Sequence, residues 1–126
     1  MQVVSHPHKD EHIDDEMVKL EVNLDDVSGE WLVYVMNLLF EAGANDVIYS
    51  PIYMKKNRPR VLLQLLSARD KMPKMKEILF KETTTLGVRY YPLSVHRLER
   101  KFKRIETEWG PLTVKEGYYE GQLVQR

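Results

Sequence analysis

The sequence of 126 residues contains no cysteine, no apolar run long enough for a membrane span and no common phosphate-binding loop. The missing cysteines exclude a disulfide framework, a thiolate nucleophile and a zinc site of the cysteine type. A membrane helix needs ~20 largely apolar residues in a row, and neither that pattern nor the layout of a signal peptide occurs. These absences predict a cytoplasmic protein without a membrane partner.

Signatures of several enzyme and binding classes are missing as well. The sequence has neither GxxxxGK[ST] nor GxGxxG, the loops that most often hold phosphates. It has no HExxH helix and no Ser/His/Asp or Cys/His set in a recognisable context. The RNA-recognition signature, with aromatic residues on central strands, is also absent. No nucleic-acid partner is therefore expected.

The composition is that of one soluble globular domain, with 43% hydrophobic and 30% charged residues. The net charge of zero conceals a strong asymmetry. Residues 1–53 carry 2 basic against 11 acidic residues, residues 54–104 carry 15 against 4, and residues 105–126 carry 2 against 4. A basic middle of this kind predicts an electropositive patch and an anionic partner, such as a phosphate compound.

Residues 1–16, "MQVVSHPHKDEHIDDE", are predicted to form a flexible tail outside the core, because they are acidic and contain little apolar material. They contain three of the four histidines. Neutral imidazole binds transition metals, so a metal-collecting tract is the alternative to a plain linker. The folded domain is predicted to span residues 17–126.

The apolar pattern within residues 17–126 predicts a βαββαβ order. "VKLEVNL" alternates as a half-buried strand does, and the stretch from Ser28 to Gly43 has helical spacing with a good N-cap and a glycine stop. Two strands joined at Asn57–Pro59, a helix with Pro73 in its first turn, one long strand that Pro92 bends, and a final strand follow. This is an α+β, ferredoxin-like βαββαβ sandwich with a C-terminal β-hairpin extension.

The segment "YMKKNRPRV", residues 53–61, concentrates four cations in nine residues: Lys55, Lys56, Arg58 and Arg60. Lysines at a hairpin tip are usually solvated and protect a sheet edge. The alternative is a site for a strongly anionic ligand, since a triphosphate needs several cations and arginine can donate two hydrogen bonds to phosphate oxygens.

Two neighbouring carboxylates, Asp25 and Asp26, follow the first strand. They can hold Mg²⁺ or Mn²⁺ bound to phosphate oxygens. Alternatively, one aspartate caps the following helix and the other is solvated.

The segment "KETTTLGVR", residues 81–89, offers hydroxyl and backbone N–H groups that can bind an anion, followed by Arg89. The alternative is a helix C-terminal turn followed by β-favouring threonines. A further basic segment, "HRLERKFKR" at residues 96–104, is favoured as a solvated strand, with a subunit or nucleic-acid contact as its alternative.

Taken together, "LEVNLDDVSGEWL", "YSPIYMKKNRPRV" and "FKETTTLGVRYY" resemble the C-terminal region of the LarC family over residues 17–117. These are nickel insertion proteins that mature the nickel-pincer nucleotide cofactor of lactate racemase. The resemblance implies a nickel chelatase or cyclometallase, classed as a lyase. Such an enzyme inserts Ni²⁺ into a pyridinium bisthiocarboxylate mononucleotide and cleaves CTP to CMP and pyrophosphate, assisted by Mg²⁺ or Mn²⁺.

The same resemblance implies roles for individual residues. Lys55, Lys56 and Arg58 would bind the phosphates of CTP, Thr84, Thr85 and Arg89 would complete the cradle, and Asp25 or Asp26 would help place the metal. The family's larger N-terminal half is missing from this sequence. The chain is therefore expected to be an incomplete enzyme with that half as a partner, and a homo-oligomer is expected from the exposed sheet edge and the final hairpin.

Two other functions stay open at this stage. A non-catalytic regulatory or oligomerisation module binding a phosphorylated ligand fits the same fold. A nucleic-acid-binding domain would use the basic middle and would show a steep dependence of affinity on salt.

Overall fold

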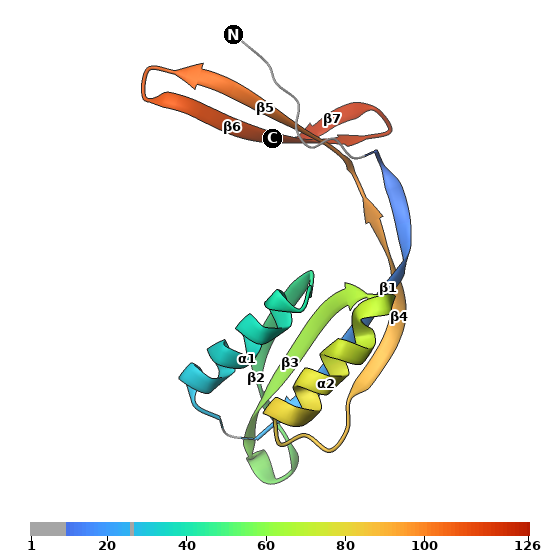
Figure 1. Ribbon diagram of the computed structural model, residues 1–126, viewed down its shortest axis with the longest axis vertical. Coiled ribbons are helices and arrows are strands. Elements are labelled where there is room, and N and C mark those ends of the chain that lie inside the picture. Colours follow the sequence, from blue (N-terminus) through green and yellow to red (C-terminus); the bar gives the residue numbers. More distant parts are fainter. Residues whose placement is uncertain (1–9, 26) are drawn as a thin grey trace. The chain divides into compact units, whose positions relative to one another are not determined.

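The computed structural model describes residues 10–25 and 27–126 of the chain. These residues fold into two compact units (Figure 1). One unit is Asp15–Leu93, and the other is Ser94–Arg126 together with residues 10–14. In the described part of the chain, no helix is both long and apolar enough to cross a membrane.

The first unit contains the predicted ferredoxin-like arrangement. Its four-stranded sheet has the strand order β2-β3-β1-β4, which is the order that a βαββαβ chain with two crossovers produces. The predicted fold class is therefore confirmed. The elements are β1 (His12–Leu24), α1 (Gly29–Glu41), β2 (Asp46–Tyr53), β3 (Pro59–Ala68), α2 (Met72–Glu82) and β4 (Arg89–Arg97), with the short 3₁₀ turns η1 (Lys55–Asn57) and η2 (Arg69–Lys71).

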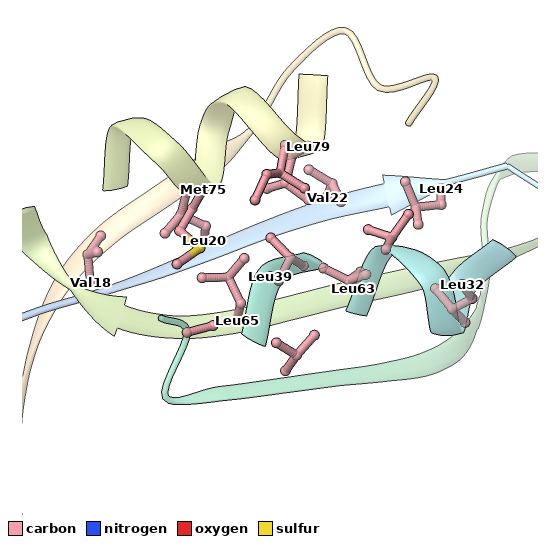
Figure 2. Close-up of a cluster of buried hydrophobic side chains, with 14 residues drawn as sticks. Val18, Leu20, Val22, Leu24, Leu32, Leu39, Leu63, Leu65, Met75 and Leu79 are labelled. Atoms are coloured by element: carbon pink, nitrogen blue, oxygen red, sulfur yellow. The ribbon is translucent and has the colours of Figure 1, made fainter. Parts of the chain in front are cut away.

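The core lies between the sheet and the two helices. Strands β1 and β3 pair antiparallel, so that Leu20 lies opposite Leu65 and Val22 lies opposite Leu63, all four fully or almost fully buried. Helices α1 and α2 cover the same face of the sheet and add Leu39 and other apolar side chains (Figure 2). Burial of each such leucine or valine contributes about 1.5–3 kcal/mol to the stability of the fold. Because side chains alternate along a strand, the other residues of β1 point to the opposite face of the sheet.

The boundaries of α1 follow from its end residues as predicted. The Ser28 hydroxyl accepts a hydrogen bond from the backbone N–H of Trp31 at 3.2 Å, which satisfies one of the unpaired donors of the first turn. Gly43 follows the helix with a φ of +104°, a conformation that glycine adopts without a steric penalty. Pro73 lies in the first turn of α2, where no N–H is needed.

Strand β1 begins earlier than the sequence pattern predicted. It starts at His12 rather than near Met17, so residues 12–16 of the predicted tail are in the strand. The side chain of Glu11 just before it accepts hydrogen bonds from His96 at 2.7 Å and from the backbone N–H of Glu120 at 2.6 Å. Residues 1–9, which include two of the histidines of the predicted tract, lie outside the described residues.

The second unit corrects the prediction of a single long strand bent at Pro92. The stretch instead forms β4 and β5 (Glu99–Thr107), which are separated at Leu98 and belong to two different sheets. Pro92 lies inside β4, which is an edge strand, so its missing N–H does not have to serve an inner ladder. Strands β6 (Gly110–Tyr119) and β7 (Gln122–Gln125) complete a sheet of order β5-β6-β7.

A polar cluster holds the β5–β6 pair together on one face. Glu116 is only 5% exposed, and its Oε1 accepts hydrogen bonds at 2.9 Å from the Lys103 ammonium and from the Tyr118 hydroxyl. The bond from Lys103, more than that from Tyr118, lowers the pKa of the Glu116 carboxyl below its ordinary value, although burial opposes this. The same bond raises the pKa of Lys103. A buried carboxylate here is acceptable because it is paired.

Candidate functional site

The turn between β2 and β3 carries the cation-rich segment in an unusual backbone conformation. The backbone N–H of Met54 donates to the carbonyl of Arg58 at 3.0 Å and closes the turn, and Tyr53 pairs with Pro59 at the strand ends. Lys56 has a φ of +62° and Asn57 a φ of +57°. Asparagine tolerates this left-handed region, whereas a lysine in it costs roughly 1–2 kcal/mol. Strain of this kind often marks a functional position.

This turn forms one wall of a pocket of about 410 Å³. The structure brings four of the predicted site residues together there: Asp25, Lys55, Lys56 and Arg58. Three further residues also line the pocket, Asn23, Met54 and Arg60. The lining thus carries four cations against one carboxylate, a balance that favours an anionic ligand with several charges. A volume of this size suits a small molecule.

Arg60 is one of the cations of the turn but not one of the predicted site residues, and the structure gives it a specific place in the pocket. Its Nε lies 2.9 Å from Oδ1 of Asp25. The antiparallel register explains this contact, because Leu24 lies opposite Val61 and the residues beside them are therefore neighbours. The register of β1 and β3 is the signal that could have assigned Arg60 from the sequence.

The acidic part of the site rests on Asp25 in the described residues, since Asp26 lies outside them. The Asp25 side chain is 71% exposed and is paired with Arg60 on one oxygen. In the described part of the chain, no group of three or more His, Asp or Glu side chains is arranged to hold a metal ion. A divalent cation at Asp25 would thus need most of its oxygen ligands from a bound phosphate compound or water.

Arg89 does not line the pocket but is linked to it through Asn23. Its Nε donates to Oε1 of Glu21 at 2.9 Å, and its Nη2 donates to Oδ1 of Asn23 at 2.8 Å. The second oxygen of Glu21 accepts from Nε2 of Gln64 at 2.9 Å. The Gln64 bond and then the Arg89 bond lower the pKa of the Glu21 carboxyl. This network crosses β4, β1 and β3 and fixes the side chain of Asn23 at the edge of the pocket.

Two threonines of the segment at residues 81–89, Thr83 and Thr85, are engaged in local structure. The Thr83 hydroxyl donates to the carbonyl of Leu79 at the end of α2, and the Thr85 hydroxyl donates to the carbonyl of Gly87 at 2.7 Å. These are the bonds of a helix C-terminal turn. Neither Thr84 nor Thr85 lines the pocket, so their phosphate-binding role stays a prediction.

Comparison with known proteins bears on the family of this chain. The sequence matches the family described as nickel insertion protein over residues 1–126. The pyridinium-3,5-bisthiocarboxylic acid mononucleotide nickel insertion protein of Acetivibrio thermocellus is 47% identical over 117 residues, which are 93% of this chain and 29% of that protein. The protein of the same name from Thermotoga petrophila is 41% identical over 107 residues, 85% of this chain and 27% of that protein. This chain thus spans about three tenths of the length of these curated relatives.

Solved structures agree with the sequence matches. The chain is similar, with a TM-score of 0.82 and 36% identity, to the C-terminal domain of a cyclometallase involved in the synthesis of the NPN cofactor of lactate racemase; the match covers 91% of this chain and 78% of that one. A Methanopyrus kandleri protein shares the fold with a TM-score of 0.71 at 23% identity, over 91% of this chain and 72% of that one. These findings confirm the resemblance drawn from the three sequence segments. The chain belongs to the nickel insertion protein family.

Proposed function

We propose that this chain is the C-terminal, CTP-binding part of a nickel insertase that inserts Ni²⁺ into pyridinium-3,5-bisthiocarboxylic acid mononucleotide. Nickel is the substrate metal of this reaction, and the product is the cofactor of lactate racemase. Two relatives carry the name of this substrate and this metal. The single observation that carries the CTP-binding role is the pocket of about 410 Å³ with four cations at the β2–β3 turn.

Each cation of the pocket has a distinct task in this proposal. Arg58 would donate two hydrogen bonds to phosphate oxygens, whereas Lys55 and Lys56 would act as point charges along the triphosphate. Arg60 neutralises Asp25 when no ligand is bound. Arg89 would act through Asn23, whose side chain it holds at the edge of the pocket. Thr84 and Thr85 would complete the cradle, and the hydroxyl of Thr85 would first have to give up its bond to Gly87.

Magnesium or manganese would accompany the nucleotide. Asp25 fits a cation that is held mainly by phosphate oxygens, because Mg²⁺ is commonly bound by one or two carboxylates plus substrate phosphates. Asp26 is proposed as the second carboxylate. When bound, the cation would neutralise the phosphates as CTP is cleaved to CMP and pyrophosphate. Nickel insertion itself would need the N-terminal half of a family protein, and a homo-oligomer is proposed for the assembled enzyme.

Calorimetric titration of this chain tests the proposal. CTP, ATP and GTP are each added with and without Mn²⁺. We expect saturable binding that prefers CTP and needs the metal. Arg58→Ala should weaken it at least about tenfold, because a hydrogen bond to a charged group contributes about 1.5–3 kcal/mol.

The matched control is Lys74→Ala, which removes a cation of the same unit that pairs with Glu77 and lies outside the pocket. The Lys74→Ala variant should bind CTP with the same affinity as the chain without substitutions. Equal losses in Arg58→Ala and Lys74→Ala would indicate non-specific attraction by the basic segment. Absence of binding to every nucleotide would contradict a CTP site in this chain.

A further inference from the structure

The second unit has a basic pocket of its own that the proposed function does not use. It has a volume of about 680 Å³ and is built only from residues between Val95 and Arg126. Four cations line it: Arg97, Arg100, Lys115 and Arg126. Among its lining residues in the described chain, none is acidic.

Gly117 is one of the residues that line this pocket. In the three-stranded sheet it lies directly between Arg100 of β5 and Gln125 of β7. A Cβ placed on Gly117 would lie 3.3 Å from Leu98 Cδ1 and 3.3 Å from Gln125 Cβ. A larger residue would therefore press against the side chains of Leu98 and Gln125, which also line the pocket. The β6–β7 register also shifts between Gly117 and Tyr118, and such bulges commonly re-aim side chains beside binding sites.

The pairing of the cations distinguishes this pocket from the rest of the hairpin. The other cations of β5 have acidic partners: Lys101 pairs with Glu99, Lys103 with Glu116 and Arg104 with Glu106. In contrast, Arg100 and Lys115 form no ion pair with any residue in the described part of the chain.

Two other side chains at the pocket already have acidic partners. Arg97 lies 3.7 Å from Asp14, and His96 bonds to Glu11. The unbalanced positive charge is thus carried by Arg100 and Lys115 on neighbouring strands.

The remaining lining indicates what else the ligand carries. Val95 and Leu98 give the pocket an apolar wall beside the cations. Arginine donates to phosphate oxygens and also stacks on flat rings. A phosphate joined to a ring would satisfy both parts of the lining, whereas inorganic phosphate would leave the apolar wall without a contact.

We propose that this pocket is a second anion site and that it binds a phosphomonoester joined to a flat ring, the class of a mononucleotide. Arg100 and Lys115 hold the phosphate, and Leu98 contacts the ring or sugar. The choice of a mononucleotide rests on the proposed function, since the relatives' names give a pyridinium mononucleotide as their substrate. The proposal that this pocket binds an anion does not depend on that choice of ligand.

Nuclear magnetic resonance titration of the whole chain tests this site. The probe is nicotinic acid mononucleotide, a pyridinium carboxylic acid with the same phosphate group. The backbone amide signals of Leu98 and Gly117 should shift in a saturable manner. Arg100→Gln and Lys115→Gln should each weaken binding at least about tenfold. The matched control is Arg104→Gln, which removes a cation from the same strand outside the pocket and should leave the affinity unchanged.

Several results would overturn the inference. Equal losses in Arg100→Gln and Arg104→Gln, or shifts that bypass Leu98 and Gly117, would mean that no site exists here. Binding of inorganic phosphate or of the phosphate-free nucleoside with the affinity of the mononucleotide would exclude this ligand class. The spectra of the variants show at the same time whether they fold.

The same titration separates this inference from the proposed function. Arg58→Ala should weaken CTP binding at least about tenfold and leave mononucleotide binding intact, because Arg58 belongs to the other pocket. If the chain without substitutions binds the mononucleotide but not CTP, only the proposed function is contradicted. If it binds CTP but not the mononucleotide, only the second site is contradicted.

Discussion

Substitution of Lys56 by glycine should raise stability and weaken nucleotide binding at the same time. Lys56 has a φ of +62° and a ψ of +29° within the β2–β3 turn. A side chain in this left-handed region costs roughly 1–2 kcal/mol, and glycine removes that cost. The same substitution removes one of the four cations that line the pocket. Stability and affinity should therefore change in opposite directions.

The expected gain in stability is smaller than the strain itself. Glycine also increases the conformational freedom of the unfolded chain, which offsets roughly 0.4–1 kcal/mol. The net increase in the free energy of unfolding is then about 0.7 kcal/mol. For a unit of the size of Asp15–Leu93, this raises the Tm by roughly 3–6 °C.

The matched variant is Lys55→Gly, which removes the neighbouring cation from the same pocket. Lys55 does not have a positive φ, so glycine brings only the unfolded-state cost and should lower the Tm. Calorimetric scans and CTP titrations of both variants provide the test. Both should bind CTP more weakly, but their Tm values should move in opposite directions. A lower Tm for Lys56→Gly would refute the argument from strain.

Three further predictions concern the core and the two polar networks. Leu20→Ala should lower the free energy of unfolding by about 2–5 kcal/mol, measured in urea, because Leu20 is fully buried. Arg89→Lys keeps the charge but cannot bridge Glu21 and Asn23 as the guanidinium does, so the urea midpoint should fall by the equivalent of about 1 kcal/mol. Glu116→Gln should flatten the acid side of a plot of Tm against pH. The pKa of Glu116 is lowered in the folded chain, so its ionised carboxylate stabilises the fold fully above the ordinary carboxyl range, and this stabilisation is lost as pH falls through the folded pKa. If Glu116→Gln left the slope of Tm against pH unchanged, the pair with Lys103 would not stabilise the fold.

Residues with a strong periodic pattern or a clear end signal were predictable from the sequence. The alternation around Leu20, the Ser28 cap and Gly43 each depend on neighbours within a few residues, and such local signals determine element type directly. The fold class followed from the order of these elements. Leu98 carries no comparable signal, because the alternation of β4 continues into β5 without interruption by glycine or proline, and the chain nevertheless changes sheets there.

The candidate site was predictable only in part. The gathering of Lys55, Lys56 and Arg58 with Asp25 depends on the closeness of one turn to the end of β1, which a βαββαβ order implies. The pair between Arg60 and Asp25 depends on the register of β1 and β3, and register is decided by packing across the whole sheet. The engagement of Thr85 with Gly87 depends on the conformation of one loop, which the residue types alone do not specify.

The division of the chain into the unit Asp15–Leu93 and a unit that contains the β5–β6 hairpin has a consequence for how the protein folds. The pairing of β1 with β3 joins residues about forty positions apart, as in Leu24 and Val61, and a loop of this length must close before the central strands can pair. The β5–β6 pair joins neighbours around one tight turn, as in Thr107 and Gly110, and hairpins form within microseconds. In a chain diluted from denaturant, the hairpin therefore forms before the sheet. During synthesis the order is reversed, because Asp15–Leu93 emerges from the ribosome before β5 and β6 do.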